Sequence, residues 1–184
     1  MRAAGLTLCV LLFSAWGAQA APDDAAARLH IFETQLEANP SATAVLQSWC
    51  DAHAPADTRI IARQVQPAPV PPPEEARKAL GVHPGEAVRY RRVQLMCGSR
   101  VLSNADNWYL PGKLTKAMNS TLDHSQTPFG KAVAALHFSR RNLETVYLPP
   151  GDPNVLRHSA VLLTGKSEPF SFVVETYTKA ILEN

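Results

Sequence analysis

Extended segments joined by tight turns dominate the second half of the chain. The runs Ala87–Cys97 and Val101–Leu110 flank Gly98-Ser99-Arg100, a short turn that predicts an antiparallel hairpin. An earlier strand is expected over Thr58–Gln66, and three more follow the hairpin: His137–Leu148, Leu156–Leu163 and Phe170–Ile181, the last two joined around Gly165-Lys166. Strands that follow one another through short turns pair antiparallel, so the chain is restricted to folds built on an antiparallel sheet.

Helical segments accompany these strands. Apolar residues recur at near-helical spacing over Ala25–Glu37, and Ser41 is placed to cap a second helix that ends near His53. Pro67–Pro73 contains five prolines and suits an extended surface connector. A domain boundary there is the alternative, but neither side alone could make a stable domain. Shorter helices are expected at Glu74–Leu80, at Pro111–Met118 and after Thr127-Pro128. The predicted fold is α+β, one antiparallel sheet with helices packed mainly on one face.

The first twenty residues have the pattern of an export signal. Arg2 precedes an apolar run from Leu6 to Trp16, and Ala18-Gln19-Ala20 supplies the small-x-small site of a signal peptidase. The run is shorter than the about 20 apolar residues that span a bilayer, although a retained anchor is the alternative. We expect cleavage after Ala20, a single domain over residues 21–184 and a secreted or periplasmic protein that has no membrane segment after cleavage.

Charge and cysteine content exclude several classes of function. The chain has 18 basic and 16 acidic residues, a balance that gives no electrostatic reason to expect nucleic acid as a partner. No metal-ligand spacing occurs, so we expect neither a metal nor another cofactor. Cys50 and Cys97 remain after signal removal, and either a disulfide or two free thiols is compatible with their spacing. Nothing in the sequence points to a particular oligomeric state.

Two charged residues stand on largely apolar strands. Residues alternate between the two faces of a strand, so Arg92 shares a face with Tyr90 and Met96, whereas Arg91 shares the other with Val93. Arg92 could make a surface ion pair or grip a ligand carboxylate. Glu175 lies among apolar residues of the last strand and must be paired, protonated or at a solvated cavity.

Several short motifs occur in the order found in chorismate lyase. They are the run Arg92–Cys97, the strand end Trp108-Tyr109-Leu110-Pro111, the turn Gln126–Gly130, and Gly165-Lys166 followed by the strand that contains Glu175. Ser41-Ala42-Thr43 stands where that family has a helical segment touching the ligand. The chain therefore resembles the chorismate lyase family over most of residues 21–184. The same fold serves as an effector-sensing domain in some transcription regulators.

The resemblance implies a closed cavity against the sheet that holds a small aromatic carboxylate. By matching position, Arg92 would hold the ligand carboxylate and Glu175 would meet the ring hydroxyl. Backbone near Ala42 and Phe129, with Gly130, would close the cavity. The implied reaction removes the enolpyruvyl group of chorismate as pyruvate and leaves 4-hydroxybenzoate.

Two departures from the family pattern affect the expected site. Asn107 replaces a second family arginine, a loss that Arg89, Arg91 or Arg140 could compensate. Glu175 lies one residue further from its hairpin proline, Pro169, and a one-residue slip moves a strand residue to the other face unless the turn absorbs it.

Three hypotheses follow from the resemblance. The first is an exported lyase, and the second is an exported module that binds an aromatic acid without catalysis. The third is a scaffold whose cavity is filled by its own side chains, such as Trp108 or Phe129. In the first two, Arg92 and Glu175 converge on one enclosed pocket, with Phe129 and Gly130 at its wall.

Overall fold

Six strands form one antiparallel sheet in the computed structural model, which describes residues 22–65 and 70–183. The predicted signal, residues 1–20, lies outside the described part. The spatial order is β1-β2-β3-β6-β5-β4, so the hairpin of the last two strands is inserted beside β3. The strands are β1 (Ile60–Val65), β2 (Arg89–Cys97), β3 (Arg100–Tyr109), β4 (Ser139–Tyr147), β5 (Asn154–Leu163) and β6 (Pro169–Thr178). The predicted α+β fold with a single antiparallel sheet is confirmed.

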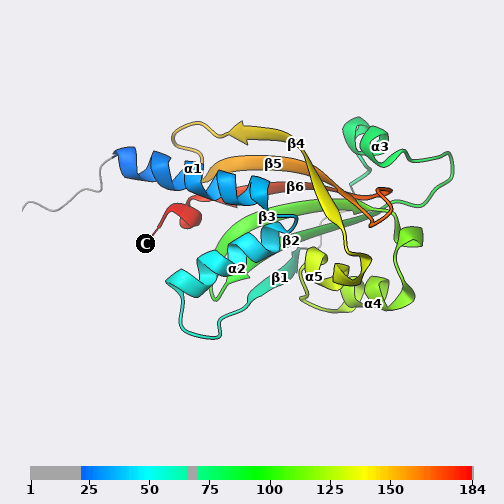
Figure 1. Ribbon diagram of the computed structural model, residues 1–184, viewed down its shortest axis with the longest axis horizontal. Helices are drawn as coiled ribbons and strands as arrows, with labels where there is room; N and C mark the ends of the chain where they lie inside the picture. Colours follow the sequence, from blue (N-terminus) through cyan, green and yellow to red (C-terminus); the bar gives the residue numbers. More distant parts are fainter. Residues whose placement is uncertain (1–21, 66–69, 184) are drawn as a thin grey trace, which may run out of the picture.

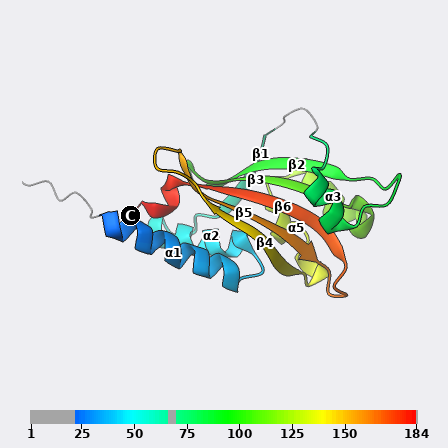
Figure 2. The same cartoon turned by 90° about the horizontal axis from the view of Figure 1, so that it is seen from above.

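The helices lie mainly on one side of this sheet (Figures 1 and 2). Four α-helices cover what we call the inner face: α1 (Pro22–Ala38), α2 (Ala42–His53), α4 (Lys116–His124) and α5 (Phe129–Ala132). The helix α3 (Glu74–Leu80) packs on the opposite, outer face. Short 3-10 helices occur at Pro111–Lys113, Ala134–Leu136 and Lys179–Leu182. None of the helices in the described ranges is long and apolar enough to cross a membrane.

Two apolar clusters share the inner face. The first joins α1 and α2 to the sheet through Phe32, Leu46, Leu95 and Tyr177. The second joins α4, α5 and the loop after them to Tyr109 and to neighbouring apolar residues of β5 and β6. Burial of these side chains is the main stabilisation that positions the helices. The boundary between these two clusters, which we call the seam, lies over the middle of the sheet.

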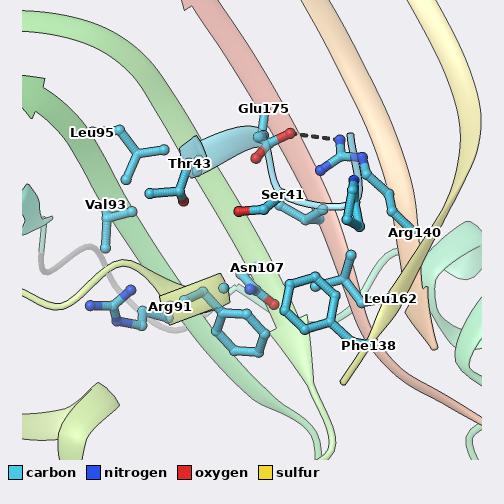
Figure 3. A pocket seen from close by; sticks show the side chains of 16 residues that line it. Ser41, Thr43, Arg91, Val93, Leu95, Asn107, Phe138, Arg140, Leu162 and Glu175 are labelled. Carbon is cyan, nitrogen blue, oxygen red and sulfur yellow. Dashed lines mark hydrogen bonds and ion pairs between the residues drawn. The ribbon is translucent and has the colours of Figure 1, made fainter. Parts of the chain in front are cut away.

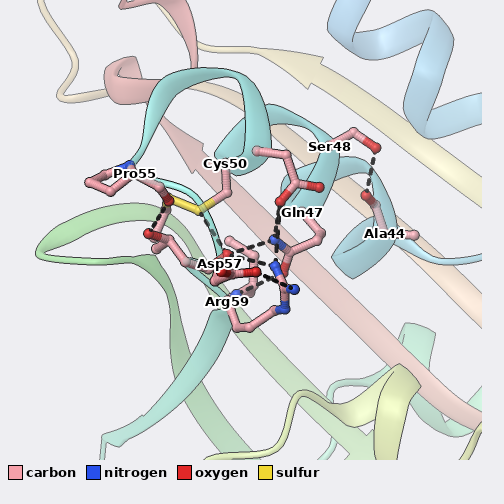
Figure 4. Close-up of polar contacts among 11 residues, drawn as sticks. Ala44, Gln47, Ser48, Cys50, Pro55, Asp57 and Arg59 are labelled. Carbon is pink, nitrogen blue, oxygen red and sulfur yellow. Dashed lines mark hydrogen bonds and ion pairs between the residues drawn. A yellow bond between two sulfur atoms is a disulfide. The ribbon is translucent and has the colours of Figure 1, made fainter.

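Helix α2 is capped at its start and attached to the sheet at two places. Ser41 caps it, since its hydroxyl accepts a hydrogen bond from the Ala44 N–H at 3.3 Å. Gln47 accepts from the backbone N–H of Ile60 at 2.9 Å and donates to the carbonyl of Thr58 at 2.9 Å. At the far end, Cys50 forms a disulfide with Cys97 on β2, with a Cα–Cα distance of 5.7 Å (Figure 4). Of the two states that the sequence left open for these cysteines, the structure has the bridge.

The predicted helix over Pro111–Met118 is wrong in its bounds. The 3-10 turn ends at Lys113, Leu114 is extended, and α4 begins only at Lys116. The reason is local: Thr115 takes the N-cap position, and its hydroxyl accepts a hydrogen bond from the Met118 N–H at 3.1 Å. A threonine before a run of helix formers competes for the backbone donors and starts a new helix.

This cap gives a stability prediction. Thr115→Ala leaves a first-turn N–H of α4 without its acceptor and is expected to lower the free energy of unfolding by about 1 kcal/mol. Urea denaturation measures the change. Thr115→Ser keeps the hydroxyl and is the matched control, expected to stay within about 0.5 kcal/mol of the natural protein. Equal losses in both variants would contradict the assigned cap.

Candidate functional site

A hollow lies at the seam between the two inner-face clusters, enclosed by the sheet, the start of α2 and the segment from α5 to β4 (Figure 3). It contains about 510 Å³ of space free of protein atoms, part of it open to solvent. Its floor is mostly apolar, and its polar lining groups are few: Ser41, Thr43, Arg91, Asn107, Arg140 and Glu175.

Arg91 is the one buried cation of the described residues lining this cavity that has no carboxylate within ion-pair distance. The residue is 8% exposed. Its Nε donates to the carbonyl of Leu122 at 3.2 Å and its Nη2 to the carbonyl of Thr127 at 3.1 Å. Burial lowers the pKa of its guanidinium from the ordinary value, although the group stays charged. Nη1 has no protein partner among the described residues and remains available to an anion.

Arg140 and Glu175 form a buried ion pair on the other side of the cavity (Figure 3). Arg140 Nη2 lies 2.7 Å from Glu175 Oε2, and the two side chains are 4% and 7% exposed. Burial alone would lower the pKa of Arg140, but the charge of Glu175 and their hydrogen bond raise it overall. The pair is neutral in sum, so Arg91 gives the cavity a net charge of about +1.

Glu175 still has one free acceptor. Its Oε2 also accepts a hydrogen bond from the Tyr177 hydroxyl at 3.0 Å, whereas no described residue donates to Oε1. The hydroxyl of Ser171 donates to Asn107 Oδ1 at 2.8 Å, which leaves the Asn107 amide N–H₂ as a donor. The cavity thus offers hydrogen-bond donors near Arg91 and an acceptor at Glu175.

The start of α2 contacts the mouth of the cavity. Ser41, Ala42 and Thr43 line it, and the first-turn N–H groups of a helix lack partners within the helix. Gly130 faces them at close range: a Cβ atom there would lie 3.4 Å from both Ser41 Oγ and Phe138 Cζ. A larger residue at 130 would therefore press on the α2 cap and on the Phe138 ring.

Most of the residues proposed from the sequence lie around this cavity. The structure brings together Ala42, Asn107, Phe129, Gly130 and Glu175. Their roles in binding stay predictions, because no ligand is present. Among the described residues, no group of three or more His, Cys, Asp or Glu side chains could hold a metal ion.

Arg92 is not in the cavity, and its predicted convergence with Glu175 is wrong. It lies on the outer face, where its Nη1 is 3.7 Å from Asp106 Oδ1 and its side chain is 42% exposed. The neighbouring Tyr90 hydroxyl also donates to Asp106, and burial together with this bond raises the pKa of Tyr90 to about 12. The alternation along β2 was correctly predicted, but the cavity was placed on the wrong face.

Arg91 and Arg140 are the two charged residues of the cavity lining that the site prediction missed, and apolar lining residues such as Phe138 and Leu162 were missed as well. Both arginines had been named only as possible compensation for the arginine replaced by Asn107. Arg91 shares a strand face with Val93 and Leu95, and these apolar neighbours were the available signal that Arg91 faces the covered side of the sheet. The remote position of Arg140, on the edge strand β4, offered no such signal.

The extra residue before Glu175 is absorbed next to the hairpin. Ser171 pairs with Leu162, but Pro169 pairs with Leu163, so β6 has one more residue than β5 at Phe170. This bulge restores the alternation, and Glu175 faces the cavity rather than the outer side.

The cavity is not filled by the two aromatic side chains that could have closed it. Trp108 lies on the outer face, where it packs near Tyr90 and Phe172 and donates to the carbonyl of Val70 at 3.0 Å. Phe129 forms part of the wall and packs near Tyr109 and Phe170.

Comparison with known proteins gives one relative by sequence. No protein-family model matches the chain. Protein y4mC of Sinorhizobium fredii is 40% identical over 183 residues, covering 87% of this chain and 77% of the relative. The chain belongs to the y4mC family. Protein y4mC is described only as an uncharacterized protein, so this sequence similarity assigns no activity to the chain.

Comparison with solved structures shows which fold this chain has. The effector domain of PhnF from Mycobacterium smegmatis superposes with a TM-score of 0.55 at 12% identity, covering 76% of this chain and 88% of that domain. A longer structure of PhnF superposes with a TM-score of 0.54 at 12% identity and covers 75% of this chain. The fold is therefore chorismate lyase-like, as the sequence predicted.

These regulators extend beyond the shared region. The chain spans 63% of the longer PhnF structure and 61% of YydK, a possible transcriptional regulator from Bacillus subtilis with a TM-score of 0.49. At an identity of 12% the likeness to PhnF shows the fold alone.

Proposed function

We propose that this domain binds a small aromatic carboxylate in the inner-face cavity, as an exported binding module without catalysis. The observation that carries the proposal is Arg91, a buried guanidinium with free donors and no carboxylate partner among the described residues. A buried charge is stabilised by a counter-ion, and a planar carboxylate matches the guanidinium fork. The effector domain of PhnF, a domain of the same fold, supports a binding role by analogy only.

The apolar walls of the cavity favour a ligand with a flat apolar ring between its two polar groups. Phe129, Phe138 and Leu162 line the space between Arg91 and the ion pair. Arg91 pairs with Asn107 and Asn107 with Val173, two residues from Glu175, so the Cα atoms of Arg91 and Glu175 are roughly 12 Å apart from strand geometry. In the proposed pose a single ring directs its carboxylate toward Arg91 and its hydroxyl toward Glu175 Oε1, to which the hydroxyl donates.

The charge count favours binding over the lyase reaction. Chorismate carries two carboxylates, whereas the cavity has a net charge of only about +1, because Glu175 neutralises Arg140. The arrangement suits a monoanion such as 4-hydroxybenzoate. The lyase remains the second candidate, with Arg91 and Arg140 in place of Arg92, since a cation pair and one acid could still orient the substrate.

Export is also part of the proposal. It is supported by the signal-like residues 1–20 and by the Cys50–Cys97 disulfide, a bond that is typical of oxidising compartments. Fractionation of cells that express the full chain tests it, because N-terminal sequencing of the periplasmic or secreted protein should begin at Ala21. An intact N-terminus in the cytoplasmic fraction would contradict export.

A ligand panel tests the binding function. Calorimetry with the purified chain from residue 21 is expected to detect 4-hydroxybenzoate, with benzoate bound about tenfold more weakly because Glu175 Oε1 loses its donor. Benzyl alcohol, which lacks the carboxylate, is the matched control and should not bind. Incubation with chorismate should release no pyruvate. Pyruvate release that Glu175→Gln abolishes would establish the lyase instead, and binding of the alcohol as tightly as the acid would exclude the role given to Arg91.

A further inference from the structure

A buried histidine stands behind the ion pair of the cavity. His158 on β5 is 1% exposed and is the direct Cα partner of Glu175 on β6. Directly opposite residues of an antiparallel pair point to the same face, with Cβ atoms about 5 Å apart. Neither ring nitrogen of His158 has a hydrogen-bond partner among the described residues. A buried imidazole without partners is unusual, and its burial favours the neutral form unless a nearby negative charge stabilises the protonated one.

Charged groups face His158 from three elements. Arg140 approaches from β4 and Glu175 from β6, and Glu33 and Glu37 act on it from α1. The Tyr177 hydroxyl, which donates to Glu175, completes the group of titratable neighbours. Burial and the charge of Arg140 lower the pKa of His158, against the opposing effect of the three glutamates. His158 is therefore neutral near pH 7, and the wall formed with Arg140 and Glu175 carries no net charge.

We propose that His158 determines ligand specificity by charge: its protonation adds one positive charge behind Glu175 and lets the cavity accept a doubly charged carboxylate. The inference rests on the proposed function. With His158 neutral, the free Oε1 of Glu175 repels a second ligand carboxylate. With His158 protonated, the wall gains one positive charge, and with Arg91 the cavity then matches a dianion.

The test compares terephthalate with benzoate, two flat acids that differ in the second carboxylate. As the pH falls from about 8 to about 5.5, calorimetry is expected to show terephthalate affinity rising severalfold, toward the limit of about tenfold that a one-unit rise in the pKa of His158 on binding would set. Benzoate affinity should change by about twofold or less, because its carboxylate lies at Arg91, far from the histidine. His158→Gln, neutral at every pH, should lose the rise for terephthalate while it still binds benzoate. His83→Gln, at an exposed histidine in the turn after α3, should keep it.

A second measurement uses the natural protein and does not depend on a variant that folds. Terephthalate binding should raise the pKa of His158 in a histidine NMR titration, whereas benzoate should leave it unchanged. Benzoate binding without any pH-dependent gain for terephthalate, or an unchanged His158 pKa with terephthalate bound, overturns this inference and leaves the proposed function intact. Failure of 4-hydroxybenzoate to bind in the same calorimetry, together with failure of both acids, overturns the proposed function itself.

Discussion

Arg91→Met is expected to weaken binding of 4-hydroxybenzoate by about thirtyfold or more. Losing a buried, charge-assisted contact costs about 2–5 kcal/mol, much of it from the carboxylate left without a partner in the cavity. Methionine keeps the apolar stem and the approximate length, so the effect reports the lost guanidinium rather than an empty space. Calorimetry at constant pH and salt measures the change.

Arg92→Met is the matched control for this prediction. It is the same substitution one residue further along β2, but Arg92 is on the outer face with its side chain 42% exposed and only a loose contact to Asp106. Its removal should alter affinity by less than about twofold, since exposed ion pairs contribute little. A larger loss in Arg92→Met than in Arg91→Met would mean that the ligand binds on the outer face. Denaturation curves for both variants show whether Arg91, which donates to the carbonyls of Leu122 and Thr127, also supports the fold.

Removing the disulfide is expected to have the largest effect on stability. Cys50 and Cys97 are separated by 47 residues, and a loop of that length corresponds to about 4 kcal/mol of lost unfolded-state entropy. For a domain of this size the double variant Cys50→Ala/Cys97→Ala should melt roughly 8–16 °C lower. Differential scanning calorimetry measures the shift.

The position of the bridge explains why its removal should affect stability. It joins the end of α2 to the end of β2 (Figure 4), and the beginning of α2 lies at the mouth of the cavity. A reductant should lower the melting temperature of the natural protein by a similar amount and have no effect on the double variant. If the reductant has no effect on the natural protein while free thiols are titrated, the bridge does not stabilise the fold.

Local patterns in the sequence determined the elements and their pairing. The turn at Gly98 predicted the hairpin of β2 and β3, Ser41 predicted the start of α2, and Glu74–Leu80 was predicted with the bounds that α3 has. Each of these depends on residues close together in the chain. Turn geometry, helix caps and strand alternation act over a few residues, so they can be recognised without knowing the neighbours in space.

Only the tertiary structure decided which residues form the cavity. Alternation separated Arg91 from Arg92, but both faces of β2 carry arginine beside apolar residues, and the covering helices alone select the inner face. The bulge at Phe170 sets the direction of Glu175, and Arg140 reaches Glu175 from the edge of the sheet. The pairing of Cys50 with Cys97 likewise required the packing of α2 on the sheet. These outcomes depend on contacts between distant segments, and a one-residue change in register reverses them, which is why the sequence alone could not determine them.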